Sequence, residues 1–234
     1  MKTYIKLHNV NFEYLIYSEY SKNLKYEALS LGSSLKKNKS SLTVQALKNI
    51  NLDIQEGSKI GLLGANGSGK TTLLRVLSQI YPPTSGKVSL SGNINSMITL
   101  NEGFDNNLTG RELTTYKYLL NYNAYPSEKV YDQIKEISEL EDWYDLPLYS
   151  YSSGMLMRLL FAIQMSFQSD ILLFDEWLSV GDRDFQFKCR DIINDKLTNN
   201  KIFVIASHNQ ELVNTICNVR IYLHKGEIVS IERN

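Results

Sequence analysis

A short tract, GANGSGKTT from Gly64 to Thr72, constrains the fold of this chain more than any other feature. Its glycines allow a tight backbone loop that residues with side chains could not follow. The apolar run KIGLLG before it is typical of a buried parallel strand. The segment TTLLRVLSQI after it has helical spacing and should end before Pro82. The tract therefore predicts a strand, a loop and a helix in succession, as in an α/β fold.

This tract also matches the phosphate-binding pattern G-x-x-x-x-G-K-S/T at every fixed position. Backbone N–H groups of Gly64, Ala65, Asn66, Gly67, Ser68 and Gly69 would surround an oxyanion at the N-terminus of the helix. We expect Lys70 to reach the terminal phosphates of a nucleotide, Thr71 to bind Mg²⁺ and Thr72 to contact the α-phosphate. The alternative is a glycine-rich turn with a chance lysine, and the flanking strand and helix argue against it.

Two adjacent acids follow a second apolar run, DILLFDE, from Asp170 to Glu176. A phosphate loop requires an acid at the end of a nearby strand to organise Mg²⁺. We assign that role to Asp175, and we expect Glu176 to polarise the attacking water as a general base. Strands often end in acids for structural reasons alone, so this assignment depends on the phosphate loop.

Strand and helix patterns alternate on both sides of a helical block. The expected strands are TYIKLHNVNFEYLIY, ALKNINLDIQEG, KIGLLG, GKVSLSG, INSMITL, DILLFDE and KIFVIAS, with VRIYLHKGEIVSI as a closing hairpin. The expected helices after TTLLRVLSQI are LTGRELTTYKYLL, SEKVYDQIKEISELEDWY, SGMLMRLLFAIQMSF, FQFKCRDIINDKL and NQELVNTI. Residues 18–40 read as a polar, partly helical excursion. The pattern predicts a mostly parallel sheet with a helical insertion.

Composition excludes several classes of protein. The 234 residues carry 25 Lys+Arg and 25 Asp+Glu, so no basic excess indicates nucleic acid as a partner. No apolar run has the length of a transmembrane helix, and the N-terminus lacks a signal-peptide pattern. Cys189 and Cys217 form no CxxC motif, so we interpret both as packing residues in a reducing compartment.

The segment YSSGM, followed by a helix and then LLFDEW, resembles the signature motif and Walker B strand of ATP-binding cassette (ABC) ATPases. The resemblance covers nearly the whole chain. It implies an α/β nucleotide-binding domain with a mixed sheet core, an N-terminal antiparallel β portion and a helical subdomain insertion. Residues 1–234 would form this single domain, with a RecA-like core at about 1–100 and 169–234 and the helical subdomain at about 101–168.

The resemblance also implies roles for individual residues. Ser152, Ser153 and Gly154 stand at the signature, Asp182 at the D-loop, and His208 at the switch histidine that contacts the γ-phosphate. The family's Mg²⁺-linking glutamine is missing here. Asn101 is the nearest chemical substitute, with Glu102 as a second candidate. For the aromatic residue that stacks on adenine we favour Tyr14 over Phe12 or Tyr17.

Within the family, the tracts LTGRE, DEWLSVGD and FQFKCRD look like those of the ATPase subunits of polysaccharide exporters. This implies ATP and Mg²⁺ as ligands, a head-to-tail homodimer, and an integral membrane subunit through which a lipid-linked polysaccharide is exported. The chain would be peripheral at the cytoplasmic face of the inner membrane, without a C-terminal carbohydrate-binding domain. The alternatives are export of another substrate, such as a lipid or drug, and a non-transport cassette ATPase.

Overall fold

The computed structural model describes residues 2–17, 34–38, 41–98, 104–175, 183–199 and 202–233. The predicted site residues Asn101, Glu176 and Asp182, together with the alternative Glu102, lie outside these ranges. The chain divides into two compact units. The first comprises Met1–Ile98, Ser169–Glu176 and Leu197–Asn234, and the second comprises Thr99–Gln168 and Trp177–Lys196.

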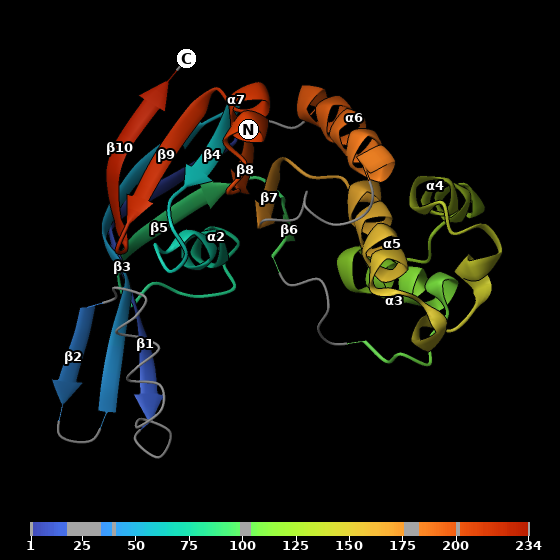
Figure 1. Ribbon diagram of the computed structural model, residues 1–234, viewed down its shortest axis with the longest axis horizontal. Coiled ribbons are helices and arrows are strands. Elements are labelled where there is room, and N and C mark those ends of the chain that lie inside the picture. Colours follow the sequence, from blue (N-terminus) through green and yellow to red (C-terminus); the bar gives the residue numbers. More distant parts are fainter. Residues whose placement is uncertain are drawn as a thin grey trace. The chain divides into compact units, whose positions relative to one another are not determined.

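The first unit contains two sheets (Figure 1). The smaller is antiparallel, in the order β2-β3-β1-β5, and consists of β1 (Tyr4–Tyr17), β2 (Ser34–Asn38), β3 (Ser41–Gln55) and β5 (Ser85–Ser91). The larger has the order β10-β9-β4-β8-β7-β6 and consists of β4 (Ser58–Leu63), β6 (Ile94–Met97), β7 (Ile171–Asp175), β8 (Ile202–Ala206), β9 (Val219–His224) and β10 (Glu227–Arg233). Of these six strands, only β10 runs antiparallel to its neighbour. The mostly parallel sheet and the N-terminal antiparallel portion predicted from the sequence are confirmed.

One apolar core joins the two sheets to helix α2 (Lys70–Leu77). Ile60 and Leu62 of β4 point into this core, whereas Gly61 between them faces helix α7 (Gln210–Ile216). A Cβ on Gly61 would lie 2.2 Å from a methyl carbon of Val213 in α7. Strand β4 is therefore covered on both faces, which explains why its sequence is a continuous apolar run rather than an alternating one.

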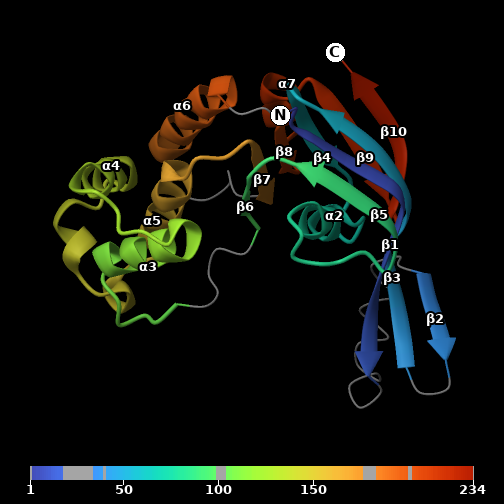
Figure 2. The same cartoon turned by 180° about the vertical axis from the view of Figure 1, so that it is seen from behind.

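The second unit is helical, and α3 and α5 lie side by side in both ribbon views (Figures 1 and 2). Its elements are α3 (Gly110–Tyr122), α4 (Glu128–Ser138), the 3-10 helices η2 (Glu141–Asp145) and η3 (Leu148–Ser150), and α5 (Ser153–Ser166). Helix α6 (Arg183–Asn199) begins in this unit and ends in the first. Apolar residues of α3, α4, η2, η3 and α5 form a second core, separate from that of the sheets.

Three elements differ from their expected form. Helix α2 ends at Leu77, because Gln79 adopts a left-handed backbone with φ of 61°. The helix expected over SEKVYDQIKEISELEDWY breaks after Ser138, where Glu139 has φ of 56°. This break lets Leu140 and Tyr144 both reach the second core. Residues 34–38 of the expected excursion form strand β2 rather than helix, pairing with β3.

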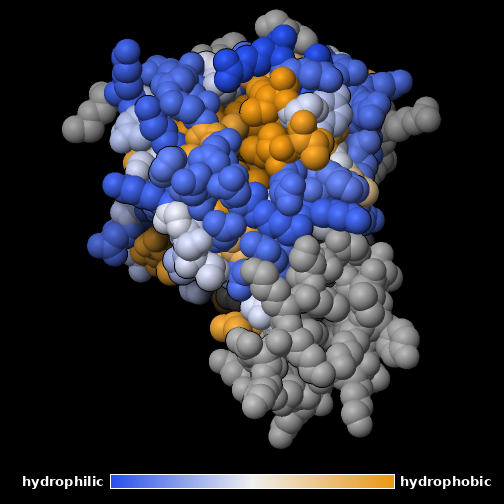
Figure 3. All heavy atoms as spheres, turned by 90° about the vertical axis from the view of Figure 1, so that its left-hand side faces the viewer, coloured by the Kyte–Doolittle hydropathy of each residue, from blue (hydrophilic) through white to orange (hydrophobic). Residues whose placement is uncertain are grey.

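No helix among the described residues is long and apolar enough to cross a membrane. Figure 3 shows an apolar patch surrounded by hydrophilic side chains on the sheet side of the first unit. On strand β10 of that unit, Val229 and Ile231 are 60% and 42% exposed. Ile231 also lines a groove of about 300 Å³ together with Leu52, Val219 and Ile221. The edge strand of the larger sheet thus presents apolar side chains to the surface.

Candidate functional site

The loop between β4 and α2 has the tight backbone that its glycines predicted. Gly64 and Gly69 have φ of 149° and 107°, values that residues with a Cβ rarely adopt. A Cβ on Gly64 would also lie 2.3 Å from the carbonyl oxygen of Leu223, so glycine is required there for space as well. Helix α2 begins immediately after Gly69, and its N-terminus therefore lies at the end of the loop.

Lys70, the first residue of α2, folds its side chain back over this loop. Its Nζ donates to the carbonyl oxygens of Gly64 at 2.8 Å and Ala65 at 3.2 Å. The residue is only 6% exposed. An ammonium group has three donors, and these bonds use two of them. Among the described residues, the arrangement holds a positive charge at the loop and leaves one donor that an anion could use.

The hairpin between β9 and β10 is hydrogen-bonded to the phosphate loop. The sequence analysis did not predict this contact. Gly226, at the hairpin turn, donates its N–H to the carbonyl oxygen of Ser68 at 2.9 Å and accepts from the N–H of Lys48 at 2.8 Å. A Cβ on Gly226 would lie 2.6 Å from the carbonyl oxygen of Ala46. The only sequence signal for this contact is the Lys-Gly turn in HKGE, which identifies a hairpin but not what the hairpin contacts.

Three strand ends meet at the edge of the sheet where the loop lies. Strands β4, β8 and β7 are parallel neighbours, and Ala206 of β8 pairs in register with Leu62 of β4 and with Asp175 of β7. The phosphate-loop pattern follows β4, His208 follows β8 and Asp175 ends β7. All three therefore belong to the same edge of the sheet. The carboxyl ends of parallel strands are where α/β sheets bind ligands.

Asp175 is half-buried at the end of β7, and His208 is exposed after β8. The segment around His208 is fixed by its neighbours. The Ser207 hydroxyl accepts from the N–H of Asn209 at 3.0 Å, and the Asn209 side chain caps α7 by accepting from the N–H of Leu212 at 3.0 Å. The expectation that Asp175 and His208 serve one site is consistent with this placement, and their chemical roles stay predictions.

Tyr14 lies in the same unit and reaches the phosphate-loop helix. Its hydroxyl forms a hydrogen bond with Oγ1 of Thr72, with 3.2 Å between the oxygens. Its ring makes edge contacts with Phe12 and Tyr81, whose own rings are stacked. Tyr14 is thus held in an aromatic cluster beside α2. Its stacking on adenine stays a prediction, and the bond to Thr72 is a contact that the sequence did not indicate.

The predicted signature residues lie in the second unit, at the N-terminus of α5. The Ser152 hydroxyl caps this helix by accepting from the N–H of Met155 at 3.2 Å. Ser152 and Ser153 are exposed, and Gly154 is half-buried. A Cβ on Gly154 would meet nothing closer than the Ser152 hydroxyl at 3.8 Å among the described residues. Neither space nor the backbone conformation of this unit requires glycine there.

The loop fits a nucleotide phosphate by its own chemistry. Oγ of Ser68 is buried and has no hydrogen-bond partner among the described residues. A Cβ on Gly64 would lie 2.7 Å from this hydroxyl oxygen, so the absence of a side chain at Gly64 gives the Ser68 hydroxyl its place in the loop. Thr71, in the first turn of α2, and Asp175 supply hydroxyl and carboxylate oxygens, which are the ligands that Mg²⁺ prefers. A triphosphate with Mg²⁺ is the ligand that such a donor set suits.

Comparison with known proteins agrees with this chemistry. Residues 47–179 match the ABC transporter family model. The chain is 38% identical to the O-antigen export system ATP-binding protein RfbE of Yersinia enterocolitica, covering 94% of each chain. It is 41% identical to the teichoic acids export ATP-binding protein TagH of Shouchella clausii over 78% of its own length, and it spans about half (51%) of that relative. The polysialic acid transport ATP-binding protein KpsT of Escherichia coli is 38% identical over 76% of this chain and 81% of its own.

Solved structures share the fold. A dimeric ATP-binding cassette in a post-hydrolysis state with ADP and phosphate superposes with a TM-score of 0.76. The match covers 98% of both chains at 22% identity, which supports the fold alone. A family model that includes both the phosphate loop and the acid-ended strand, and a relative matched over nearly its full length, place this chain in the ABC transporter family, as an ATP-binding cassette.

Proposed function

We propose that this chain is the ATP-hydrolysing subunit of an exporter of lipid-linked polysaccharide. One observation carries the ATP-hydrolysing part of the proposal: the phosphate loop follows β4, His208 follows β8 and Asp175 ends β7, and these three strands are parallel neighbours. Phosphoryl transfer requires positioning and charge neutralisation more than covalent chemistry by the protein. This edge of the sheet offers backbone donors, a buried cation and oxygen ligands for both purposes.

Each residue at the loop would have a separate task. Backbone N–H groups from Gly64 to Thr72 would hold the phosphates, and Lys70 would bind the terminal ones. Thr71 and Asp175 would hold Mg²⁺, with Asn101 as a further ligand, and the bound ion would neutralise charge on the phosphates. Tyr14 would stack on adenine.

Hydrolysis would require residues that follow the acid-ended strand. Glu176 would take a proton from the attacking water, and His208 would contact the γ-phosphate. Glu176 comes directly after β7 in the sequence and His208 comes two residues after β8, and both strands are neighbours at the edge of the sheet where the phosphate loop lies, which supports these two roles.

A second copy of the chain would complete the site. The exposed hydroxyls of Ser152 and Ser153 and the N-terminus of α5 suit the γ-phosphate of a nucleotide held by another copy. The resemblance of the SVGD tract to the D-loop implies that Asp182 would act at the same interface. A two-fold head-to-tail dimer would then contain two equivalent sites. Binding of ATP would hold the halves together, and hydrolysis would release them.

The export role rests on the relatives. O-antigen, teichoic acid and polysialic acid export or transport appear in the names of the relatives described above. We infer the same class of substrate here, a polysaccharide carried on a lipid. Translocation would need an integral membrane partner, and this chain would then act at the cytoplasmic face of the membrane that holds the partner.

The substitution Glu176→Gln tests the enzymatic part of the proposal. We expect ATP binding to be unchanged, phosphate release to fall at least about a hundredfold, and an ATP-bound dimer to accumulate on size exclusion. Wild-type turnover in this variant would remove Glu176 from the mechanism.

Export is tested by deleting the gene in its host. Polymer should then be lost from the cell surface while its lipid-linked form accumulates inside, and unchanged surface polymer would contradict the proposed substrate.

A further inference from the structure

The LTGRE tract has no task in the chemistry proposed above, yet it is tightly integrated into the second unit. Thr109 caps helix α3 by accepting from the N–H of Glu112 at 3.2 Å, and the Glu112 carboxylate accepts in return from the N–H of Thr109 at 2.8 Å. This reciprocal capping box fixes where the helix begins. The neighbouring residues Leu108, Gly110 and Arg111 therefore have fixed positions relative to the start of α3.

The tract is bonded to the segment that leads into the signature helix α5. Leu148 donates its N–H to the carbonyl oxygen of Leu108 at 2.8 Å, and Tyr149 donates to that of Asn106 at 3.0 Å. Thr109 also forms an isolated antiparallel bridge with the residue before Leu148. The loop at 106–109 and the segment at 147–149 thus form a short ladder, far apart in the sequence but paired in space.

Gly110 allows a second, closer contact. A Cβ at this position would lie 2.6 Å from the hydroxyl oxygen of Tyr151 and 2.7 Å from the carbonyl oxygen of Tyr144. The Tyr151 hydroxyl donates to the carbonyl oxygen of Trp143 at 2.7 Å. Burial raises the pKa of Tyr151 to about 12, so the hydroxyl stays a donor over the whole physiological range. Tyr151 directly precedes Ser152, the residue that caps α5.

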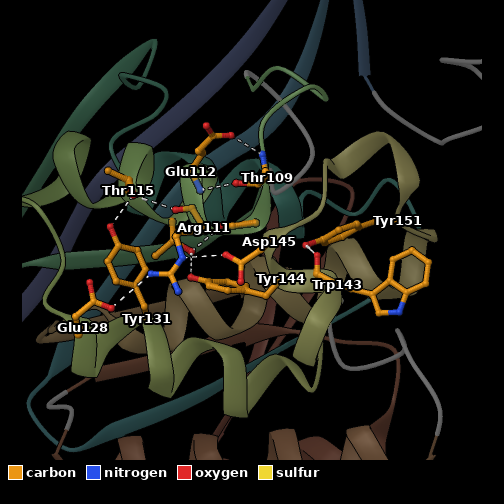
Figure 4. A network of polar contacts seen from close by, with 12 residues as sticks. Thr109, Arg111, Glu112, Thr115, Glu128, Tyr131, Trp143, Tyr144, Asp145 and Tyr151 are labelled. Carbon is orange, nitrogen blue, oxygen red and sulfur yellow. Dashed lines mark hydrogen bonds and ion pairs between the residues drawn. The ribbon is translucent and has the colours of Figure 1, made fainter.

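Arg111 binds the other side of the same segment (Figure 4). Its Nε donates to Oδ1 of Asp145 at 2.9 Å, and its Nη1 lies 3.6 Å from a carboxylate oxygen of Glu128. Its guanidinium carbon lies 4.7 Å from the ring centre of Tyr131 and 5.7 Å from that of Tyr144. A planar guanidinium suits this combination of stacking and directed donation, and an ammonium group does not.

We propose that the LTGRE tract, through Gly110 and Arg111, is a latch that positions the signature turn for the nucleotide of the partner copy. Arg111 binds Asp145 of η2, and Gly110 leaves room for the hydroxyl of Tyr151. The backbone ladder binds residues 147–149, which lie between Asp145 and Tyr151 in the sequence. The chain from Asp145 to Ser152 is thereby fixed to the start of α3 at several points. Arg111 and Tyr151 are positioning residues, since neither would touch ATP. The proposal rests on the proposed dimeric ATPase.

Two variants test the latch. Arg111→Gln replaces the charged guanidinium by a shorter, neutral amide, and Tyr151→Phe removes one hydroxyl with the least risk to folding. We expect faster hydrogen exchange at the amides of Leu148, Tyr149 and Met155 in both, with unchanged exchange in α2. Nucleotide affinity, set by the phosphate loop of the first unit, should stay within about twofold of wild type, while kcat for ATP falls roughly tenfold to a hundredfold.

Arg220→Gln is the matched control, because Arg220 also donates its Nε to a carboxylate, that of Glu232 at 3.1 Å, but lies in the first unit. It should change neither the exchange at 148–155 nor kcat. Wild-type exchange and kcat in both latch variants would overturn the proposal. So would a fall in kcat that Arg220→Gln shares. If the wild-type chain released no phosphate, the proposed function would fail, whereas exchange at the same amides would still decide whether the latch exists.

Discussion

Lys70 shows how the site depends on a single residue. The residue is almost fully buried, and the acceptors described for its ammonium group are two neutral carbonyl oxygens. A buried charge that lacks an opposite charge is costly. Folding tolerates it here because the carbonyls of the loop solvate the ammonium, and a bound phosphate would supply the missing negative charge. The residue is thus poised for an anionic ligand.

Replacing Lys70 by Ala should therefore weaken nucleotide binding itself. A hydrogen bond to a charged group is worth about 1.5–3 kcal/mol, so loss of the ammonium should raise the Kd for ATP at least about tenfold. An equilibrium titration with a fluorescent ATP analogue measures this. Lys87→Ala, at an exposed lysine of the same unit, is the control and should bind as wild type does. Equal affinity in both variants would count against the phosphate-loop assignment.

The two cysteines are expected to be inert in the native protein. Cys189 and Cys217 are 2% and 4% exposed, and burial raises the pKa of each thiol from 9.0 to about 12. Since the thiolate is the reactive form, alkylation by iodoacetamide at pH 8 should be slower than that of a free thiol by roughly a thousandfold. Mass spectrometry of native and urea-unfolded samples checks this. Rapid native labelling of either residue would show that it is not a packing residue.

At the scale of elements, the phosphate loop relies on a hairpin that lies far away in the sequence. The β9–β10 turn donates to Ser68 and is itself held by the N–H of Lys48, so β3, the loop and the hairpin form one hydrogen-bonded group. Gly226 must have φ of 83° and must also lie against the carbonyl oxygen of Ala46. Gly57 has a similar φ of 87°, but a Cβ there would meet no atom of the described residues within 4 Å.

These two glycines give a matched pair of substitutions. Gly57→Ala should lower the free energy of unfolding by only about 1–2 kcal/mol, because a residue with a Cβ is strained in the left-handed backbone region. Gly226→Ala should cost more, because its Cβ would lie 2.6 Å from a carbonyl oxygen, and it should also weaken ATP binding by displacing Ser68. Urea denaturation and ATP titration measure both effects. Identical stability and affinity in the two variants would mean that the hairpin does not support the loop.

The elements also show what the sequence can and cannot predict. Apolar runs and the glycine pattern are local signals, so β4, the loop and the start of α2 were predictable. The break after Ser138 was not, since the helical spacing continues past Glu139 and the turn is favoured by burial of Leu140 and Tyr144 in the second core. The contact of Gly226 with Ser68 depends on which strands pair, and no local pattern encodes that.

At the scale of the whole molecule, the predicted site residues fall in two units. The phosphate loop belongs to the first unit, and the predicted signature residues belong to the second. In the proposed dimer each nucleotide would use the loop of one copy and the signature turn of the other. Ser152 and Asp175 are close in the sequence, yet they would then act on two different nucleotides. Helix α5 and strand β7 of one copy would connect the two nucleotide sites of the dimer.

A mixture of two inactive variants tests this division. Gly154→Asp places a negative charge where the γ-phosphate of the partner's nucleotide would lie, and the fold should tolerate it, because the Cβ has space and acids are favoured at helix N-termini. Lys70→Ala disables the phosphate loop instead. Each variant alone should lack turnover, since both of its sites would contain a defect.

In a mixed dimer, one site would combine the intact loop of the Gly154→Asp copy with the intact signature of the Lys70→Ala copy. Phosphate release should therefore reappear on mixing, with Gly154→Asn as the neutral control for size. A mixture as inactive as its components would indicate that loop and signature of the same copy act together.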